Sequence, residues 1–277
     1  MPDRLLRAVQ AAASEVGSTV WVLDMGSAAG AWGMAKSANA ERDGLLRCVE
    51  APLGTLGMQL LAWFIRRTSV QDTELRLAPG GCVAVKRLRS FSRQAVRRLR
   101  SAPTGVSTLS GGTGAVGLLT ASWMVQQGVE RVVLLSRSGG IASGAQPHWD
   151  SANSSSVVRV ELCDVGTEGA VRCSLEHTGT GAIVHSAGVL ADALLVNQTQ
   201  LGLQRVWAPK AHAAWHLHRA SLQHRPFALF SSVAALLGGA GQANYAAANA
   251  CLDGLARLRQ ASGLAATSIQ WGAWGGA

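Results

Sequence analysis

One tyrosine, one serine and one asparagine have the types and spacing of a proton-transfer site. The chain contains a single tyrosine, Tyr245, which lies 13 residues after Ser232 and four residues before Asn249. If Tyr245 opens a helix, Asn249 lies one turn further on and on the same face. Ser232 follows the apolar segment 227–230, and we expect it at the carboxyl end of a buried strand, where α/β sheets bind ligands. The alternative is a tyrosine whose hydroxyl anchors a turn.

A glycine-rich turn between a strand and a helix indicates a dinucleotide site. A strand is expected over 106–110 and a helix over 118–127, and four glycines lie in the seven residues between them. Glycine allows a tight turn and a close approach of the backbone to a pyrophosphate, whose charge the helix N-terminus stabilises. The next strand, expected over 131–135, completes the strand–helix–strand unit in which such a turn binds a dinucleotide.

The residues after that second strand favour NADPH over NADH. An NAD site has a carboxylate there for the ribose hydroxyl, whereas this chain has Ser136 and Arg137. A hydroxyl and a guanidinium suit a 2′-phosphate. Asp164 follows the strand expected over 157–162 and is placed to meet the adenine. The alternative for Arg137 is an exposed charge at a strand end.

Composition favours a folded intracellular protein. The 277 residues are 48% hydrophobic and 15% charged, which provides a core and argues against disorder. The longest apolar segment, 53–65, is shorter than the roughly 20 residues that cross a bilayer. A signal peptide would begin with basic residues followed by an apolar segment, and the N-terminus lacks this pattern. We expect a cytoplasmic protein, with the plastid as the alternative.

Neither a metal site nor a disulfide framework is expected. The five cysteines are widely scattered and form no Cys-x-x-Cys pair, which indicates thiols in a reducing compartment. His212 and His216 have the i, i+4 spacing of two metal ligands, but the pattern brings no third ligand near them.

The net charge of +9 is concentrated in the first part of the chain. Residues 1–104 carry 15 Lys and Arg against 8 Asp and Glu. The spacing of Arg93, Arg97 and Arg100 places them on one helical face. A solvated face is the first interpretation and an acidic protein partner the second. Nucleic acid comes last, because no aromatic residue lies between Arg93 and Arg100.

A short segment at 101–105, rich in Pro, Gly and Ser, divides the chain in two. Before it we expect strands over 19–23 and 45–50, a helix over 53–67, and a hairpin of 74–77 with 82–86. After it, strands are expected over 106–110, 131–135, 157–162, 182–185, 226–231 and 266–270, with helices from 114, near 208–221 and over 245–260. This alternation predicts an α/β fold with a doubly wound, Rossmann-like parallel sheet. The segment 138–156 is expected to be a loop or a decayed helix.

The second part resembles the ketoreductase domain of a type I polyketide synthase, a complex-type short-chain dehydrogenase/reductase. The motifs are Ser110-Gly-Gly-Thr-Gly-Ala-Val-Gly117, Leu134-Leu-Ser-Arg137, Cys163-Asp-Val165, His185-Ser-Ala-Gly188, Trp207-Ala-Pro-Lys210, Phe230-Ser-Ser232, Gly241-Gln-Ala-Asn-Tyr-Ala-Ala-Ala-Asn249 and Gln270-Trp-Gly-Ala-Trp274. Residues 1–104 resemble, more loosely, the truncated pseudo-Rossmann structural subdomain of the family. The resemblance therefore implies a structural domain over 1–104 and a catalytic, NADPH-binding domain over 105–277.

The resemblance implies a role for each of four side chains. Tyr245 donates a proton to the ketone oxygen, Ser232 holds that oxygen in line, and Lys210 assists the tyrosine. Asn249 organises the lysine and a proton-relaying water. Taken alone, Lys210 is typical of a surface lysine and Asn249 of a helix residue bonded to backbone. The implied cofactor-binding residues are Ser110, Gly111, Gly112, Thr113, Gly114, Ala115, Val116, Gly117, Ser136, Arg137, Asp164, Val165, Ser186, Ala187 and Gly188.

Three further residues are implied to control stereochemistry. Asp192 keeps the second aspartate of the Leu-Asp-Asp loop found in B-type enzymes, which give D-configured alcohols, whereas Ala191 replaces the first. Leu237 stands where A-type enzymes carry a tryptophan. Asn244 fits the B type, although Ala240 replaces its usual proline. The resemblance thus favours the B type.

The implied activity is NADPH-dependent reduction of a β-ketoacyl thioester carried on acyl carrier protein. The implied partners are that carrier protein and other synthase domains, with no nucleic acid or membrane. Two alternatives remain open: the equivalent reductase of a type I fatty acid synthase, and an inactive, cofactor-binding scaffold domain. The interval from Asp164 to His185 is shorter than the family pattern, and the chain ends at Ala277, before a helical lid. Both departures favour the scaffold.

Overall fold

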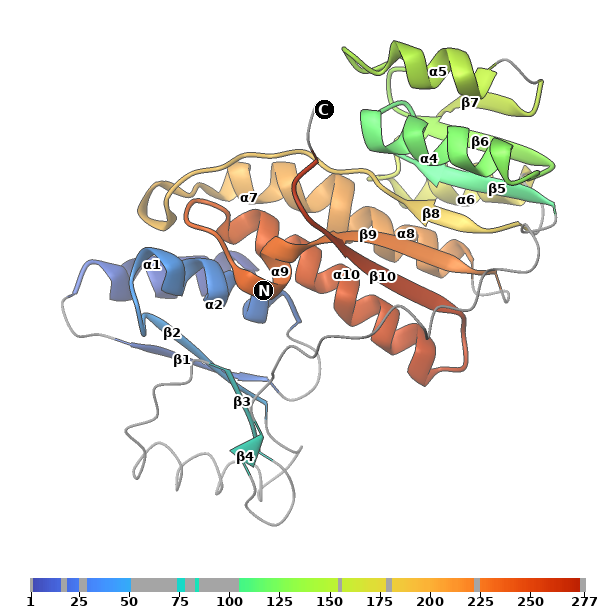
Figure 1. Cartoon of the computed structure of the whole chain (residues 1–277). Helices are drawn as coiled ribbons and strands as arrows, with labels where there is room; N and C mark the ends of the chain where they lie inside the picture. Colours follow the sequence, from blue (N-terminus) through green and yellow to red (C-terminus); the bar gives the residue numbers. More distant parts are fainter. Residues whose placement is uncertain are drawn as a thin grey trace, which may run out of the picture. The chain divides into compact units, whose positions relative to one another are not determined.

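The computed structural model contains two sheets with flanking helices (Figure 1). It describes residues 2–15, 19–24, 29–50, 74–77, 83–84, 105–153, 156–177, 181–221 and 225–274. The chain divides into two compact units. The first comprises Met1–Arg97, Ala191–Gln204 and Val233–Cys251, and the second comprises Arg98–Leu190, Arg205–Ser232 and Leu252–Ala277. Residues 101–104 lie outside the described residues, so a domain boundary there stays a prediction.

The second unit is built on a six-stranded parallel sheet. Its spatial order is β10-β9-β8-β5-β6-β7, and every neighbouring pair is parallel. The strands are β5 (Val106–Ser110), β6 (Arg131–Ser136), β7 (Val158–Leu162), β8 (Ile183–His185), β9 (Phe227–Ser232) and β10 (Ala266–Trp271). The strand order reverses between β5 and β8, which is the topological switch point where Rossmann-type sheets bind ligands. The predicted Rossmann-like α/β fold is confirmed.

Helices cover both faces of this sheet (Figure 1). On one face α4 (Ala115–Gln126) and α5 (Gln146–Asn153) pack through buried residues such as Leu118 against Leu134 of β6. On the other face, α6 (Glu168–His177), α8 (Ala213–Ala220) and the second half of α10 (Ala243–Ala261) bury residues such as Leu217. Because both faces are covered, the central strands β6, β8 and β9 have largely apolar sequences, whereas the edge strand β7 alternates apolar and polar residues.

The first unit contains a smaller, four-stranded sheet. Its order is β1 (Val20–Asp24), β2 (Leu46–Glu50), β3 (Glu74–Leu77) and β4 (Val83–Ala84). The first three strands are parallel, and β4 pairs antiparallel with β3, which confirms the predicted hairpin. Two helices, α1 (Pro2–Ala13) and α2 (Ala29–Glu41), pack with this sheet, and α2 also contacts the short α9 (Val233–Leu237).

Several elements differ from the sequence predictions. Helix α5 forms within 138–156, where a loop or decayed helix is expected. The helix expected near 208–221 begins as a π-helix, η3 (Ala208–His212), and continues as α8. The pattern does not predict α2 or α7 (Gln200–Trp207). In α2 the small residues are buried on most sides, so no apolar stripe of helical period appears in its sequence.

Two further sequence predictions fall on residues outside the described ones. These are the helix over 53–67 and the basic face of Arg93, Arg97 and Arg100. Among the helices that the structure does describe, none is long and apolar enough to cross a membrane.

Candidate active site

The turn between β5 and α4 has a backbone that requires glycine. Gly111 has φ of +67°, which L side chains rarely adopt, and a Cβ placed there would lie 2.6 Å from the Cα of Ala187. Gly114 precedes α4 in an extended conformation, and no side chain caps the first N–H groups of that helix. Uncapped N–H groups at a helix N-terminus are favourable partners for a phosphate. The local structure therefore suits a pyrophosphate.

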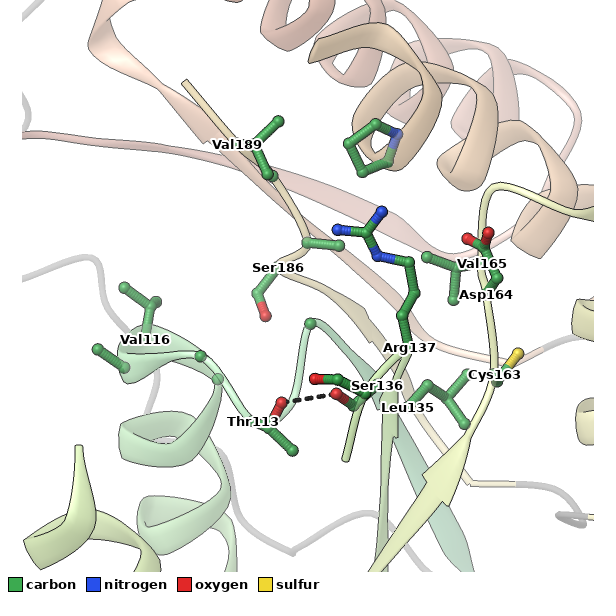
Figure 2. A pocket seen from close by; sticks show the side chains of 18 residues that line it. Thr113, Val116, Leu135, Ser136, Arg137, Cys163, Asp164, Val165, Ser186 and Val189 are labelled. Atoms are coloured by element: carbon green, nitrogen blue, oxygen red, sulfur yellow. Dashed lines mark hydrogen bonds between the residues drawn. The ribbon is translucent and has the colours of Figure 1, made fainter. Parts of the chain in front are cut away.

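This turn forms one wall of a cleft of about 400 Å³ at the carboxyl ends of the strands (Figure 2). The predicted cofactor residues in its lining are Gly111, Thr113, Gly114, Ala115, Val116, Gly117, Ser136, Arg137, Asp164, Val165, Ser186, Ala187 and Gly188. Ser110 and Gly112 are predicted residues that do not line it. The lining residues that sequence reasoning missed are Leu135, Ser138, Cys163, Val189 and Pro209. Leu135, Cys163 and Pro209 lie within the motifs given above, and Ser138 and Val189 directly follow two of them, so the motifs themselves are the signal that could have found these residues.

Hydrogen bonds tie the glycine-rich turn to the end of β6. The hydroxyl of Thr113 donates to Oγ of Ser136 at 2.8 Å, as Figure 2 shows. The same oxygen accepts the backbone N–H of Gly139 at 3.2 Å. Because Ser136 accepts both bonds, its own proton can be donated to a third group. Ser136 therefore supports the turn and keeps a donor for an anionic ligand.

Arg137 gives the end of β6 a positive charge. Its exposed side chain extends into the cleft in Figure 2. No carboxylate follows β6 directly, since residues 136–138 are Ser, Arg and Ser. Asp164 lies at the end of β7 and accepts the N–H of Gly166 at 2.9 Å. A cation where NAD sites carry an acid fits NADPH.

Lys210 is buried, in contrast to the surface lysine that its sequence alone would indicate. Only 4% of it is exposed, and its Nζ donates to the carbonyl of Phe230 at 3.2 Å. Its amine lies against Gly188 of the cleft, where a Cβ would come within 3.2 Å of Nζ. Burial lowers the pKa of Lys210 to about 8, and the negative charge of Asp253 partly opposes that shift. The amine of Lys210 therefore lies directly behind Gly188 in the lining of the cleft.

Ser232 lies at the carboxyl end of β9. It is the last residue of that strand, is half-buried, and pairs in register with Trp271 of β10. Its hydroxyl therefore belongs to the edge of the sheet at which the cleft opens. This is the strand position that the sequence predicts for it.

In the first unit, Tyr245 and Asn249 lie one turn apart at the start of α10. The backbone N–H of Tyr245 donates to Oδ1 of Asn244 at 2.6 Å. Asn249 is fully buried, and its Nδ2 donates to the carbonyl of Tyr245 at 2.9 Å. The half-buried tyrosine is thus held at a defined position on the helix. The bond from Asn249 to backbone is also what the alternative interpretation of this residue predicts.

Of the predicted stereocontrol residues, Asp192 lies in a loop of the first unit, and Asn244 lies at the start of α10, directly after a second loop over 238–242. Hydrogen bonds join the two loops. Nδ2 of Asn244 donates to the carbonyl of Ala191 at 2.7 Å. Asp192 accepts Nε2 of Gln242 at 3.2 Å. The carboxylate of Glu41 accepts two backbone N–H groups, one from each loop, which are Gly241 at 2.9 Å and Leu195 at 2.7 Å. Sequence reasoning missed Glu41, because nothing in the local pattern links residue 41 to these loops.

Leu237 and the two histidines do not share these contacts. Leu237 ends α9 and is 64% exposed. His212 contacts the ring of Trp207, and Nδ1 of His216 lies 3.3 Å from the carbonyl oxygen of Val165. Within the part of the chain that is described, no group of three His, Cys, Asp or Glu side chains is arranged to hold a metal ion.

Cys163 is a thiol in the wall of the cleft. It is buried, and its pKa is raised to about 11 by burial first and then by the charges of Glu161 and Asp164 and by Cys173. A thiol with a raised pKa is a poor nucleophile at neutral pH. Cys163 therefore contributes shape rather than reactivity.

The four predicted catalytic residues are divided between the two units. Lys210 and Ser232 belong to the second unit, and Tyr245 and Asn249 belong to the first. Each pair has the local geometry described above. The meeting of all four side chains at one carbonyl stays a prediction.

A model of the KR domain family matches residues 105–276, which is more than half of the chain. This chain belongs to the ketoreductase (KR) domain family. Polyketide synthase GfsA of Streptomyces halstedii is 46% identical over 179 residues, which cover 62% of this ketoreductase chain and 2% of GfsA. Pks1 of Mycobacterium tuberculosis, a polyketide synthase whose name describes it as inactive, is 43% identical over 179 residues, covering 61% of this chain and 11% of Pks1.

The ketoreductase fold also matches a solved structure. PlmKR1, a ketoreductase from the first module of phoslactomycin biosynthesis in Streptomyces sp. HK803, has a TM-score of 0.86 and 28% identity. That match covers 98% of this chain and 68% of PlmKR1. The resemblance to ketoreductase domains of polyketide synthases is thereby confirmed. The chain spans only a small part of each synthase it matches.

Proposed function

We propose that this ketoreductase chain uses NADPH to reduce a β-ketoacyl thioester, carried on acyl carrier protein, to the β-hydroxyacyl thioester in polyketide biosynthesis. The observation that carries the proposal is Lys210, whose buried amine lies against Gly188 in the lining of the dinucleotide cleft. Burying an ammonium is unfavourable, so a buried lysine with a lowered pKa beside a cleft supports a catalytic role.

The residues of the cleft suit the pyrophosphate, the 2′-phosphate and the adenine of NADPH. When bound, NADPH supplies the hydride. The glycine-rich turn and the N-terminus of α4 would bind the pyrophosphate. Arg137 and the hydroxyl of Ser136 would bind the 2′-phosphate through charge-assisted hydrogen bonds. Asp164 would lie near the adenine.

The proposed chemistry is proton donation to a ketone oxygen. The hydroxyl of Ser232 donates a hydrogen bond to that oxygen and so orients the carbonyl. Tyr245 transfers its hydroxyl proton to the oxygen as negative charge develops there. The ammonium of Lys210 stabilises the phenolate that remains, and Asn249 organises the lysine and a water that returns the proton.

Cofactor preference tests the role of Arg137. We expect Arg137→Ala to raise the KM for NADPH about tenfold or more while leaving that for NADH within about twofold, because only NADPH loses a charge-assisted contact. Initial rates with each cofactor measure both values. Arg131→Ala is the matched control, since Arg131 is also exposed but begins β6 instead of ending it. Equal effects on the two cofactors would reject the assignment.

Product configuration tests the B-type assignment. Hydrogen bonds join the loop of Asp192 to the start of α10, where Asn244 lies, and residue 237 is a leucine rather than a tryptophan. We expect mainly the D-alcohol from a β-ketoacyl thioester, as measured by chiral chromatography. Mainly L-alcohol would reject the B type.

A cofactor-binding scaffold without activity is the second candidate. It is favoured by the likeness to Pks1 and by the short interval between Asp164 and His185. NADPH absorbance, followed with trans-1-decalone or a short β-ketoacyl thioester, separates the two candidates. Saturable NADPH binding without consumption of either substrate would favour the scaffold. A fatty acid synthase origin is a variant of the first candidate, and the chain length of the preferred acyl thioester distinguishes the two pathways.

A further inference from the structure

His185 lies at the topological switch point of the sheet. It ends β8, is fully buried, and pairs in register with Ser110, the last residue of β5. The glycine-rich turn starts directly after Ser110. The imidazole therefore lies behind the cleft and cannot touch substrate or cofactor.

Both ring nitrogens of His185 are engaged, and the partners define the tautomer. Nε2 lies 2.9 Å from the backbone carbonyl oxygen of Lys210, and Nδ1 lies 2.6 Å from Oγ of Ser110. A carbonyl oxygen only accepts, so Nε2 carries the proton. Nδ1 is then the acceptor of the Ser110 hydroxyl. The ring is neutral and satisfied at both nitrogens.

The carbonyl that His185 holds belongs to an irregular turn. Lys210 lies in η3, and the N–H of Ala213 donates to the carbonyl of Ala208, five residues earlier. Short π-helical turns are frequent at functional sites and depend on contacts outside the helix. The side chain of Lys210 is fixed at its other end by the carbonyl of Phe230. The lysine is thus restrained at its backbone by β8 and at its amine by β9.

We propose that His185 is a positioning residue for the lysine: its Nε2–H holds the carbonyl of Lys210, and its Nδ1 links that turn to Ser110 at the start of the glycine-rich turn. This inference rests on the proposed function only where it assigns a consequence for turnover. The charged groups that act on the pair are the ammonium of Lys210 and the carboxylate of Asp253. A neutral imidazole adds no repulsion to the buried ammonium.

Two amide substitutions that differ by one methylene test the proposal. A glutamine places its amide near the position of Nε2, whereas an asparagine reaches only the position of Nδ1. His185→Gln should keep the bond to the Lys210 carbonyl, and His185→Asn should lose it. Ser107→Ala is the matched control, because Ser107 is a buried serine of β5 whose hydroxyl has no hydrogen-bond partner among the described residues.

The direct readout is the titration of Lys210, which needs no turnover. The chain has three lysines, Lys36, Lys86 and Lys210, so 13Cε-lysine spectra are simple and Lys210→Arg assigns the signal. We expect a pKa of about 8 in the wild type and in Ser107→Ala. His185→Gln should stay close to that value. His185→Asn should raise it by about one unit or more toward 10.5, because a released lysine gains solvent.

Turnover provides the second readout. With decalone, His185→Asn should lower kcat about 10- to 100-fold, as expected for a catalytic group displaced by roughly an ångström, and His185→Gln should restore most of it. An unchanged Lys210 titration in both variants would overturn the proposal. If the titration behaves as expected but the wild type consumes no NADPH, the positional inference holds and the reductase function is rejected.

A wild-type measurement covers the case in which neither variant folds. In 15N-histidine spectra we expect the ring of residue 185 to carry its proton on Nε2 and to stay neutral at pH 5. A proton on Nδ1, or titration near 6.5, would overturn the proposal.

Discussion

Tyr245 carries the only phenol of the chain, which makes its removal an unambiguous test at the scale of one residue. We expect Tyr245→Phe to lower kcat about 100-fold or more, since a positioned proton donor contributes roughly that much. The affinity for NADPH should change less than about twofold, because the cleft is lined by residues of the second unit alone. Rates with decalone and fluorescence titration with NADPH measure the two quantities. A kcat within a few-fold of the wild type would contradict the role of the phenol.

The pH dependence of the rate depends on Lys210. Burial lowers its pKa to about 8, so the protonated lysine that the reaction uses is lost above that pH and kcat/KM should fall there. The charge of Asp253 raises this pKa, so Asp253→Asn should move the basic limb to lower pH. Asp150→Asn is the control, because Asp150 also accepts a glutamine amide but lies exposed at α5. A basic limb that moves equally in both variants would exclude the electrostatic coupling.

The sequence identified site residues that belong to a contiguous motif better than residues whose role depends on contacts with distant parts of the chain. The glycine-rich turn, Ser136 and Arg137 lie in the cleft lining because a strand–turn–helix motif is contiguous in the chain. The environment of Lys210 could not be predicted from its neighbours in the sequence, because its partners His185 and Phe230 lie on strands β8 and β9. The link from Glu41 to Gly241 spans 200 positions and leaves no local trace.

At the scale of elements, Gly128 and Gly111 both have left-handed backbone conformations but differ in the space around them. Replacing each by alanine therefore separates the cost of backbone strain from the cost of steric crowding. Gly128 has φ of +81° and no atom within 4 Å of the place a Cβ would take, whereas a Cβ at Gly111 would also meet the backbone of Ala187. Gly128→Ala should therefore cost about 1–2 kcal/mol of unfolding free energy, the cost of the conformation alone. Gly111→Ala should cost at least about 2 kcal/mol more, because backbone must move. Urea denaturation measures both changes.

The same pair separates stability from binding. Gly111→Ala should weaken NADPH binding, and Gly128→Ala should leave it unchanged, because Gly128 follows the far end of α4. Equal losses of stability and equal affinities in the two variants would show that the contact with Ala187 does not shape the turn.

The strands were more predictable than the helices. All six strands of the parallel sheet coincide with predicted segments to within one or two residues. Strands β6, β8 and β9 have the dense apolar runs that are typical of buried strands. Helix α2 has no such signal: a Cβ at Gly33 would clash with the backbone of Ala246, so its sequence is set by close packing in three dimensions. The π-turn at Lys210 likewise depends on β8, an earlier strand that is not its neighbour in the chain.

At the scale of the whole molecule, one buried ring should make folding sensitive to acid. Burial, and then the charge of Lys210, lower the pKa of His185 to about 3 from 6.5. The unfolded chain therefore binds the proton first, and stability falls as pH drops from 6.5 toward 3. At pH 5 this ring should cost about 2 kcal/mol of unfolding free energy relative to pH 8. Urea denaturation measures the free energy of unfolding at pH 8 and at pH 5. Between these two values it should fall about 2 kcal/mol further in the wild type than in His185→Gln. An equal fall in the two proteins would contradict the assignment.

The unreactive thiol in the cleft wall has a practical consequence for labelling. Cys163 stays protonated at neutral pH, whereas Cys173 on α6 is exposed. Electrophilic dyes such as maleimides should therefore attach to the outer surface of α6 long before they reach the nucleotide pocket. A fluorophore introduced in this way would leave the nucleotide pocket open, because Cys173 is not among the residues that line it.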